Sequence, residues 1–595
     1  MVARSLTVAA LKSGSPVQCA SMTWTQNYDP FGSPVLSTLV AALPVVLLLG
    51  LLATGKVHAP MAALFGLLAA IGAAVLAFVP DEAGNAASGG QIAWAGTVLA
   101  AAGNGAAFGL LPIGWIVLAA IFLYALTVET GQFEIVKHSV LSLSGDRRIQ
   151  ALLIAFSFGA FVEGAAGFGT PVAISAALLI GAGFKPLYAA GLALLANTSP
   201  VAFGALGTPI VTLADVTNIY GEENKQRTLL ELSAMAGRQL PIFSLVVPVW
   251  LVWVMAGWRA TLAIWPALVV AGGSFALVQF LTANFHGPWL VDVAGGLVSL
   301  ACLALLLRVW QPREEWHFAH ESAIRTEVIV YPRSKVIAAW VPWLLLTAFV
   351  FVWGLAALPD FKRMLSPTAV PIAVPGLHRQ VARTEPVVPE REVENAIYNF
   401  NPLTATGTGI FLAAIASALY MRVSPRRFTA VFLRTCWQMR WPLFTISAML
   451  AIAFTTRYSG MDATLGLAFT KTGWIYPLFA ALLGWLGVAL TGSDTSANAL
   501  FGSLQTITAR KLVADGVLPL SPDQAAVLLA TANSTGGVMG KMIDAQSIVV
   551  AAVATQQHGQ EGAILRFVFL HSLVLAILMG LLVMAQAYWL SWMIP

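Results

Sequence analysis

The feature that most constrains this chain is a long series of apolar stretches, each close to the length of a membrane span. A helix of about 20 apolar residues crosses the hydrocarbon core of a bilayer. We expect spans at Val35–Ala53, Pro60–Val79, Pro112–Val128, Ile149–Phe161, Leu240–Ala256, Leu262–Leu281, Leu290–Leu307, Val336–Leu358, Thr404–Tyr420, Pro442–Phe454, Trp474–Leu490 and Ile564–Leu590. Two further regions, Glu163–Val216 and Thr491–Ala554, are apolar but rich in Gly, Ser, Thr and Asn, and are expected to be broken or re-entrant. The pattern predicts an all-α polytopic membrane protein with roughly 12–14 transmembrane elements.

The scarcity of charge excludes other protein classes. Asp, Glu, Lys and Arg make up 10% of the 595 residues and apolar residues 58%, against about 25% and 45–50% in soluble proteins. So few charges do not cover several soluble domains, and disorder requires the opposite bias. The net charge of +5 fits basic residues that orient loops, so we expect a lipid bilayer and no nucleic acid as partner.

The hydrophilic stretches divide the chain into segments. An N-terminal segment covers residues 1–34, and its first 21 residues are not native if Met22 is the true start. The segments that follow are a first membrane half (35–308), a hydrophilic loop (309–335), a transmembrane helix (336–358), a Pro-rich hydrophilic loop (359–403) and a second membrane half (404–595). Five arginines between Arg422 and Arg440, with no acid among them, predict a cytoplasmic loop there.

Both halves carry the same polar pattern. In the first, within 161–216, Phe161-Val-Glu-Gly-Ala-Ala-Gly-Phe-Gly-Thr-Pro-Val precedes a helix predicted to end at Ala196-Asn-Thr-Ser. In the second, within 489–554, Leu490-Thr-Gly-Ser-Asp-Thr-Ser-Ala-Asn precedes a helix predicted to end at Ala532-Asn-Ser-Thr. Small residues can simply allow close helix packing, but a pattern at matching positions of two halves favours a binding site. We therefore expect two inverted repeats, each with a re-entrant glycine-rich hairpin and a discontinuous helix.

Exposed N–H groups at half-helix N-termini and in glycine loops suit an anion. The substrate-binding candidates are Gly164, Gly167, Gly169, Thr170, Asn197, Thr198, Ser199, Gly492, Ser493, Thr495, Ser496, Asn533, Ser534 and Lys541. Lys541 has two open interpretations: it attracts a substrate carboxylate, or it pairs with Asp544 three residues on.

Three acids in apolar surroundings are the proton-coupling candidates: Glu163, Asp494 and Asp544. An ionisable group within a membrane costs at least about 2.5–3.5 kcal/mol and usually has a function. For Glu163 the alternative is a hydrogen bond between loop and helix.

Cofactor chemistry finds little support. The three cysteines lack C-x-x-C spacing, His317 and His320 lack companions at metal-ligand spacing, and Gly536–Met542 departs from a Walker A motif. We expect no cofactor, no metal and no enzyme activity.

The sequence resembles the L-lactate permease family, over nearly the whole chain from about Trp24 to Pro595. The resemblance is carried by Gly159–Ala173, Gly183–Gly191, Ala196–Ala205, Leu490–Phe501 and Gly537–Ile543, among others. It implies proton-coupled uptake of a small 2-hydroxymonocarboxylate across the bacterial inner membrane, and by analogy an elevator-like homodimer. The chain departs from the family where Asp544-Ala545 replaces Ser-Pro.

The predicted function is therefore lactate/proton symport, with D-lactate and glycolate as further substrates. Three alternatives stay open: a sodium-coupled carboxylate transporter, a carboxylate anion channel, which equilibrates its substrate without accumulating it, and an integral-membrane enzyme.

Overall fold

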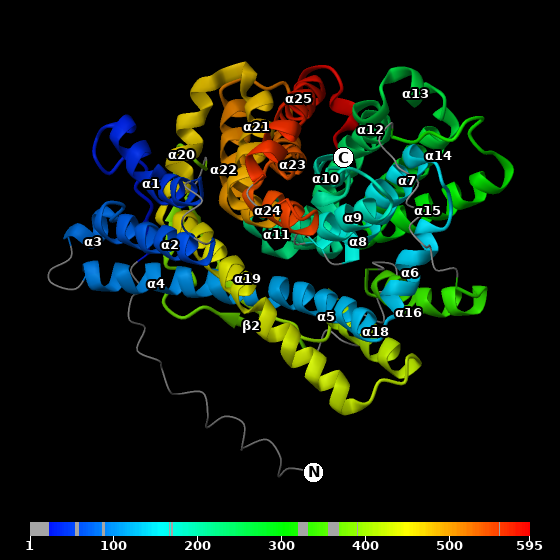
Figure 1. The fold of residues 1–595 in the computed structure, drawn as a ribbon. Coiled ribbons are helices and arrows are strands. Elements are labelled where there is room, and N and C mark those ends of the chain that lie inside the picture. Colours follow the sequence, from blue (N-terminus) through cyan, green and yellow to red (C-terminus); the bar gives the residue numbers. More distant parts are fainter. Residues whose placement is uncertain are drawn as a thin grey trace, which may run out of the picture.

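The computed structural model describes residues 23–595, apart from 54–56, 58, 86–89, 166, 168–169, 319–330, 355–367, 389–390 and 558–559. The described chain is mainly helical (Figure 1), which confirms the predicted all-α membrane architecture. Among these residues, eight helices are long and apolar enough to cross a membrane, or ten if two bent pairs each form one span. Four shorter apolar helices accompany them. Residues 1–21, which a start at Met22 would exclude, lie outside the described residues.

The first half contains α1 (Pro34–Ala53), α2 (Ala59–Leu76), α3 (Asp81–Asn85), α4 (Gly90–Phe108), η1 (Gly109–Gly114), α5 (Trp115–Glu129), α6 (Gln132–Leu141), α7 (Arg147–Ala151), η2 (Leu152–Phe158), α8 (Gly159–Ala165), α9 (Thr170–Gly181), α10 (Pro186–Ala196), η3 (Val201–Phe203), α11 (Gly204–Thr217), η4 (Glu222–Asn224), α12 (Lys225–Ala256), α13 (Trp258–Leu262), α14 (Trp265–Phe285), η5 (Pro288–Leu290) and α15 (Val291–Val309). After α16 (Arg333–Gly354), the second half contains α18 (Thr406–Tyr420), α19 (Pro425–Ser459), α20 (Met461–Phe469), η7 (Thr470–Ile475), α21 (Tyr476–Thr491), α22 (Asp494–Ala514), α23 (Pro522–Gly540), α24 (Ala545–Ala554), α25 (Glu561–Tyr588) and η8 (Ser591–Met593).

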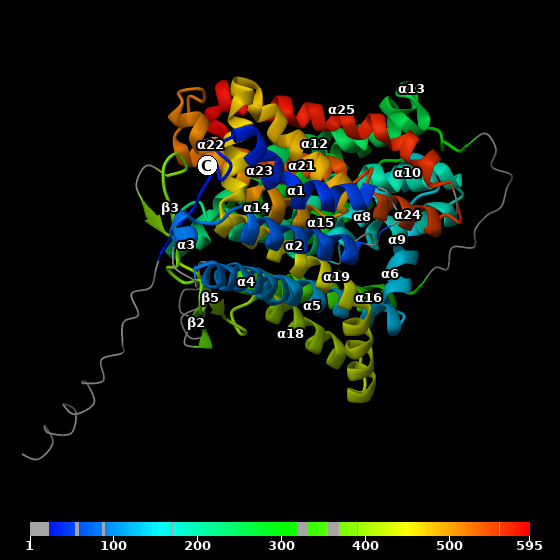
Figure 2. The same cartoon turned by 90° about the vertical axis from the view of Figure 1, so that its left-hand side faces the viewer.

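Helices of the two halves intermix. Helices α21, α22 and α23 pack on one another, and α11 and α12 of the first half pack against α22 and α23 (Figure 1). The long helix α19 passes along α2, α4 and α5, which lie in a layer beneath α1 (Figure 2).

The predicted loop between Arg422 and Arg440 is wrong, because most of it is the first part of α19. Ser424 caps that helix by accepting a hydrogen bond from the Arg427 N–H at 3.4 Å, and Pro425 occupies its first turn. Arg427 and Arg434 both pair with Glu129 of α5. The side of the membrane on which these arginines lie stays a prediction.

Helix α4 is a span that the hydropathy pattern missed. Its glycines and Asn104 dilute the apolar character, but they also allow a close helix contact. A Cβ on Gly105 would lie 2.9 Å from the Ala451 Cα of α19, so the two backbones touch only because a side chain is missing there.

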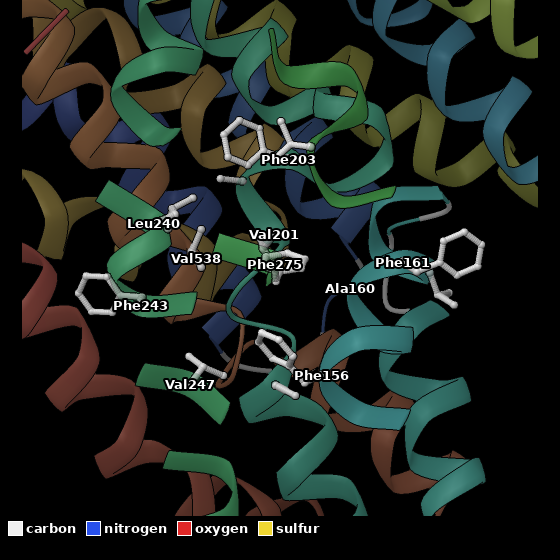
Figure 3. Packing of buried hydrophobic residues seen from close by; sticks show 14 of the residues in the cluster. Phe156, Ala160, Phe161, Val201, Phe203, Leu240, Phe243, Val247, Phe275 and Val538 are labelled. Carbon is white, nitrogen blue, oxygen red and sulfur yellow. The ribbon is translucent and has the colours of Figure 1, made fainter. Parts of the chain in front are cut away.

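Large apolar side chains hold the centre of the molecule together. Val538 of α23, Leu240 of α12 and Val201 of η3 belong to one buried cluster, so both halves contribute to one core (Figure 3). On the opposite side of this view, Phe161 of α8 packs where Gly296 of α15 leaves room: a Cβ on Gly296 would lie 2.6 Å from the Phe161 nitrogen. This contact fixes α8 against α15.

Two small sheets, which the sequence did not indicate, form outside the helices. β2 (Val370–Ala373) pairs antiparallel with β5 (Ile397–Phe400), and β3 (Val381–Arg383) lies between β1 (Trp24–Thr25) and β4 (Glu392–Val393). Glu394 joins the second sheet to α19 through ion pairs with Arg383 (2.6 Å) and Arg457 (3.0 Å). Burial raises the pKa of Glu394, but the two arginines outweigh it and hold that pKa below its usual value.

Candidate substrate-binding site

The first-half helices break where the glycine-rich sequences predicted it. α8 ends at Ala165 and α9 begins at Thr170, with Gly167 at φ +59° between them. α10 ends at Ala196, and the chain bends by 64° into the segment containing α11. Three consecutive residues of α11 are left-handed: Ala205 (φ 44°), Leu206 (φ 56°) and Gly207 (φ 77°). The two breaks touch, because a Cβ on Gly167 would lie 3.0 Å from that of Ala205.

A left-handed conformation costs an L-residue about 1–2 kcal/mol. Ala205 and Leu206 are held in it by their buried surroundings, and such strain is common at functional sites. The Thr208 hydroxyl donates to the Ala205 carbonyl at 2.6 Å, so this left-handed turn is held next to the break after α8.

The second half breaks before α22 and again after α23. Gly492 (φ 73°) ends α21, and Ser493 caps α22 by accepting a hydrogen bond from the Ser496 N–H at 3.3 Å. The predicted helix end at Asn533 is wrong, since α23 continues to Gly540. Asn533 is instead held inside the helix bundle: its amide donates to Asn498 Oδ1 at 2.9 Å and accepts from Gln505 Nε2 at 3.3 Å.

Glycines around Asn533 serve close packing. A Cβ on Gly484 of α21 would overlap the Asn533 carbonyl, and one on Gly536 would overlap the Ala481 carbonyl. At these positions small residues bring α21 and α23 together. The true break follows at residues 541–544, before α24 begins.

The breaks of both halves line one cavity of about 410 Å³. α11 contributes Gly204, Ala205 and Pro209 to its wall, and α19 contributes Met439, Trp441, Pro442, Thr445 and Ile446. The predicted site residues in the wall are Glu163, Gly167, Gly492, Ser493, Asp494, Thr495, Ser496 and Lys541.

Lys541 is the basic residue of this cavity wall. Its ammonium group donates to the Gly492 carbonyl at 2.7 Å and lies 3.2 Å from Asp544 Oδ2, so the predicted pair with Asp544 exists. The other Asp544 oxygen accepts from the Ser547 N–H at 2.7 Å and so caps α24. Lys541 thus contacts both breaks of the second half and still faces the cavity.

Two acids face the same cavity. Asp494, 3% exposed, accepts a hydrogen bond from Ser534 Oγ at 2.6 Å, while its second oxygen has no partner among the described residues. Glu163, 4% exposed, packs against the backbone of Gly204, where a Cβ would lie 2.5 Å from Oε1. Lys541 and Asp544 are the charged neighbours that act on Glu163. The first-half acid therefore faces the second-half lysine.

The remaining candidates lie behind the wall or outside the described part. Gly164, Asn197, Thr198, Ser199, Asn533, Ser534 and Asp544 are described but do not line the cavity. Thr198 donates to the Leu195 carbonyl at 2.7 Å, which is a helix-end contact. Gly169 lies outside the described residues, and for Thr170 only the backbone is described.

Comparison with known proteins gives the family. The family model described as L-lactate permease matches residues 37–590. The chain belongs to the L-lactate permease family. It is 44% identical to the glycolate permease GlcA of Escherichia coli (strain K12), covering 95% of this chain and 98% of that protein. It is 43% identical to the L-lactate permease of the same strain and 42% identical to that of Bacillus subtilis (strain 168). Each of these two alignments covers 96% of this chain and 100% of the relative.

A solved structure, the Alcanivorax borkumensis YdaH transporter, aligns with 81% of this chain and 86% of its own at 15% identity and a TM-score of 0.41. Family membership and the apolar helices together make this permease a multi-pass membrane protein of bacterial type.

Sequence reasoning missed two buried polar residues of this permease. Asn498 donates to the Pro209 carbonyl of α11 at 3.1 Å and so connects α22 to the unwound helix of the other half. Asp292 of α15 packs against Gly164, where a Cβ would lie 2.7 Å from its own Cβ. Both carried a signal: Asn498 lies four residues after Asp494, on the same helix face, and Asp292 is an acid inside a predicted span.

Proposed function

We propose that this permease takes up lactate, and also D-lactate and glycolate, by proton symport across the bacterial inner membrane. The observation that carries the proposal is the convergence of the helix breaks of both halves on one cavity with an ammonium group and two carboxyl groups in its wall. The names of the relatives, which are lactate and glycolate permeases, support the substrate class.

The substrate carboxylate has two matched binding elements in this proposal. Helix α22 begins at Asp494, and the first N–H groups of a helix have no partner within it and carry partial positive charge. The Lys541 ammonium adds a full charge beside Gly492. Thr495 and Ser496, both in the cavity wall, supply hydroxyl groups for the 2-hydroxyl of the substrate.

The proton carriers in this proposal are Glu163 and Asp494. With Asp544 they give three buried carboxyl groups around one ammonium group. Each uncompensated buried charge costs several kcal/mol, and one ammonium group does not compensate three carboxylates. Protonation of Glu163 removes the negative charge facing Lys541 and leaves the lysine to the substrate carboxylate, which couples binding of the proton to binding of the anion.

One proton moving with one monocarboxylate carries no net charge, so transport depends on the pH and lactate gradients and little on membrane voltage. The homodimer, the segment boundaries given above and the inner-membrane location stay predictions.

The test is uptake of radiolabelled L-lactate into proteoliposomes under an inward proton gradient in sodium-free buffer, with protein-free liposomes as control. We expect a transient accumulation above equilibrium that an uncoupler abolishes. Accumulation only with sodium would favour the sodium-coupled alternative, and equilibration without accumulation would favour the channel.

A further inference from the structure

Asp292 is a buried acid that the proposed mechanism does not yet use. It lies in the first turn of α15 and is 1% exposed, and neither carboxyl oxygen has a hydrogen-bond partner among the described residues. The backbone next to Asp292 packs closely against the end of α8, since a Cβ on Gly164 would lie 2.7 Å from the Val293 nitrogen. Asp292 therefore lies directly behind the cavity wall formed by Glu163.

The surroundings of Asp292 are not those of a structural acid. Buried polar groups in folded proteins are almost always hydrogen-bonded, and an orphaned one calls for an explanation. Glu163 is the charged group that acts on Asp292. Glu163 in turn is faced by Lys541 and Asp544, from the turn between α23 and α24.

Two neighbouring buried carboxyl groups do not ionise together without a large cost. The doubly ionised state of the pair formed by Glu163 and Asp292 is therefore unfavourable, and the pair takes up one proton readily. The position of Asp292 in the first turn of α15 favours its negative form through the helix dipole, so a proton on Asp292 is able to leave.

We propose that Asp292 shares the transported proton with Glu163, so that the two carboxyl groups act as one proton-carrying pair. This inference rests on the proposed proton symport. A proton from cavity water binds the Glu163 carboxylate and passes to the Asp292 carboxylate, which leaves Glu163 ionised opposite Lys541. When the proton returns to Glu163, the Lys541 charge is again left to the substrate. Only O–H bonds form and break in these steps.

The test compares two activities of Asp292→Asn in proteoliposomes. One is accumulation of lactate under a pH gradient, and the other is exchange of labelled for unlabelled lactate at equal pH, which needs no net proton movement. We expect accumulation to fall by about tenfold or more while exchange stays close to the wild-type rate. The pH profile of uptake should move toward lower pH by about one unit, because Glu163 loses a like-charged neighbour.

Two variants serve as controls. Asp292→Glu keeps the carboxyl group and is expected to restore part of the accumulation. Asp462→Asn removes another buried carboxyl group, which accepts a hydrogen bond from Ser503 at 2.6 Å and does not line the cavity. This variant should keep the wild-type pH profile.

The outcomes separate the pair from the function on which it rests. Wild-type accumulation and pH profile in Asp292→Asn would overturn the pair, and so would loss of exchange in both Asp292 variants, which would show a structural role. Accumulation that requires sodium would overturn it as well. If the wild type itself fails to accumulate lactate, the proposed function is wrong. In that case the pair is tested by exchange alone, and a pH profile of exchange that is unchanged in Asp292→Asn would contradict it.

Discussion

Replacement of Lys541 by methionine separates the two interpretations of this residue. The Asp544 carboxylate, fully buried, would lose its ion-pair partner at 3.2 Å and keep only the Ser547 N–H. Breaking a buried pair costs about 3–5 kcal/mol, and the remaining hydrogen bond favours the lower end of that range. If Lys541 also binds the substrate, the lost charge-assisted hydrogen bond is worth about 1.5–3 kcal/mol, which raises KM about 10- to 150-fold.

The double variant Lys541→Met/Asp544→Asn distinguishes these effects. It also removes the carboxylate that Lys541→Met leaves without its ion-pair partner, so we expect stability to recover most of the loss while KM for lactate stays high. Thermal unfolding in detergent measures stability, and initial uptake rates at a series of lactate concentrations measure KM. Lys511→Met, which removes the lysine of a partly exposed helix pair with Asp515, is the control and should change neither by more than a small amount. Recovery of both stability and KM in the double variant would refute the substrate role.

Three further predictions follow from the same contacts. Glu163→Gln and Asp494→Asn should each abolish accumulation driven by a pH gradient but leave lactate exchange. Wild-type accumulation and pH dependence in both variants would show that these two acids do not carry the proton. Gly484→Ala should lower stability by about 1–3 kcal/mol, since its Cβ overlaps the Asn533 carbonyl, whereas Gly72→Ala, with open space around it, should not; equal melting curves would contradict the close packing. Because the pKa of Glu394 is lowered in the folded protein, its ion pairs stabilise the fold above the unfolded pKa of about 4.3 and that stability is lost as pH falls through the lower folded value. Glu394→Gln should therefore be less stable at pH 7 and lack this acid-dependent step in tryptophan fluorescence, and an unchanged step would refute the assignment.

The sequence predicted the parts of the fold that depend on local chemistry. Apolar length marks α12, α14, α15 and α25 because a bilayer span requires it. The breaks at Gly167 and Gly492 were also predictable, because glycine readily adopts the left-handed conformation that both residues take at the ends of helices.

Other features depend on partners that lie far away in the sequence. The end of α23 was misplaced because the Asn533 side chain finds its hydrogen bonds on Asn498 and Gln505 of α22 and so does not interrupt the helix. α4 was missed because its glycines are explained only by the α19 backbone that packs on them. Asp292 was overlooked because the residues beside which it lies, Gly164 and Glu163, are more than 120 residues earlier in the sequence.

The most direct test of proton-coupled lactate transport is to let lactate drive the proton. Proteoliposomes carrying a pH-sensitive dye receive an inward lactate gradient in sodium-free buffer, with equal pH on both sides and protein-free liposomes to measure passive entry of lactic acid. We expect the lumen to acidify faster than in those liposomes, at a rate that saturates with lactate and does not change when the membrane voltage is clamped. Entry of labelled lactate without this faster acidification would contradict proton symport.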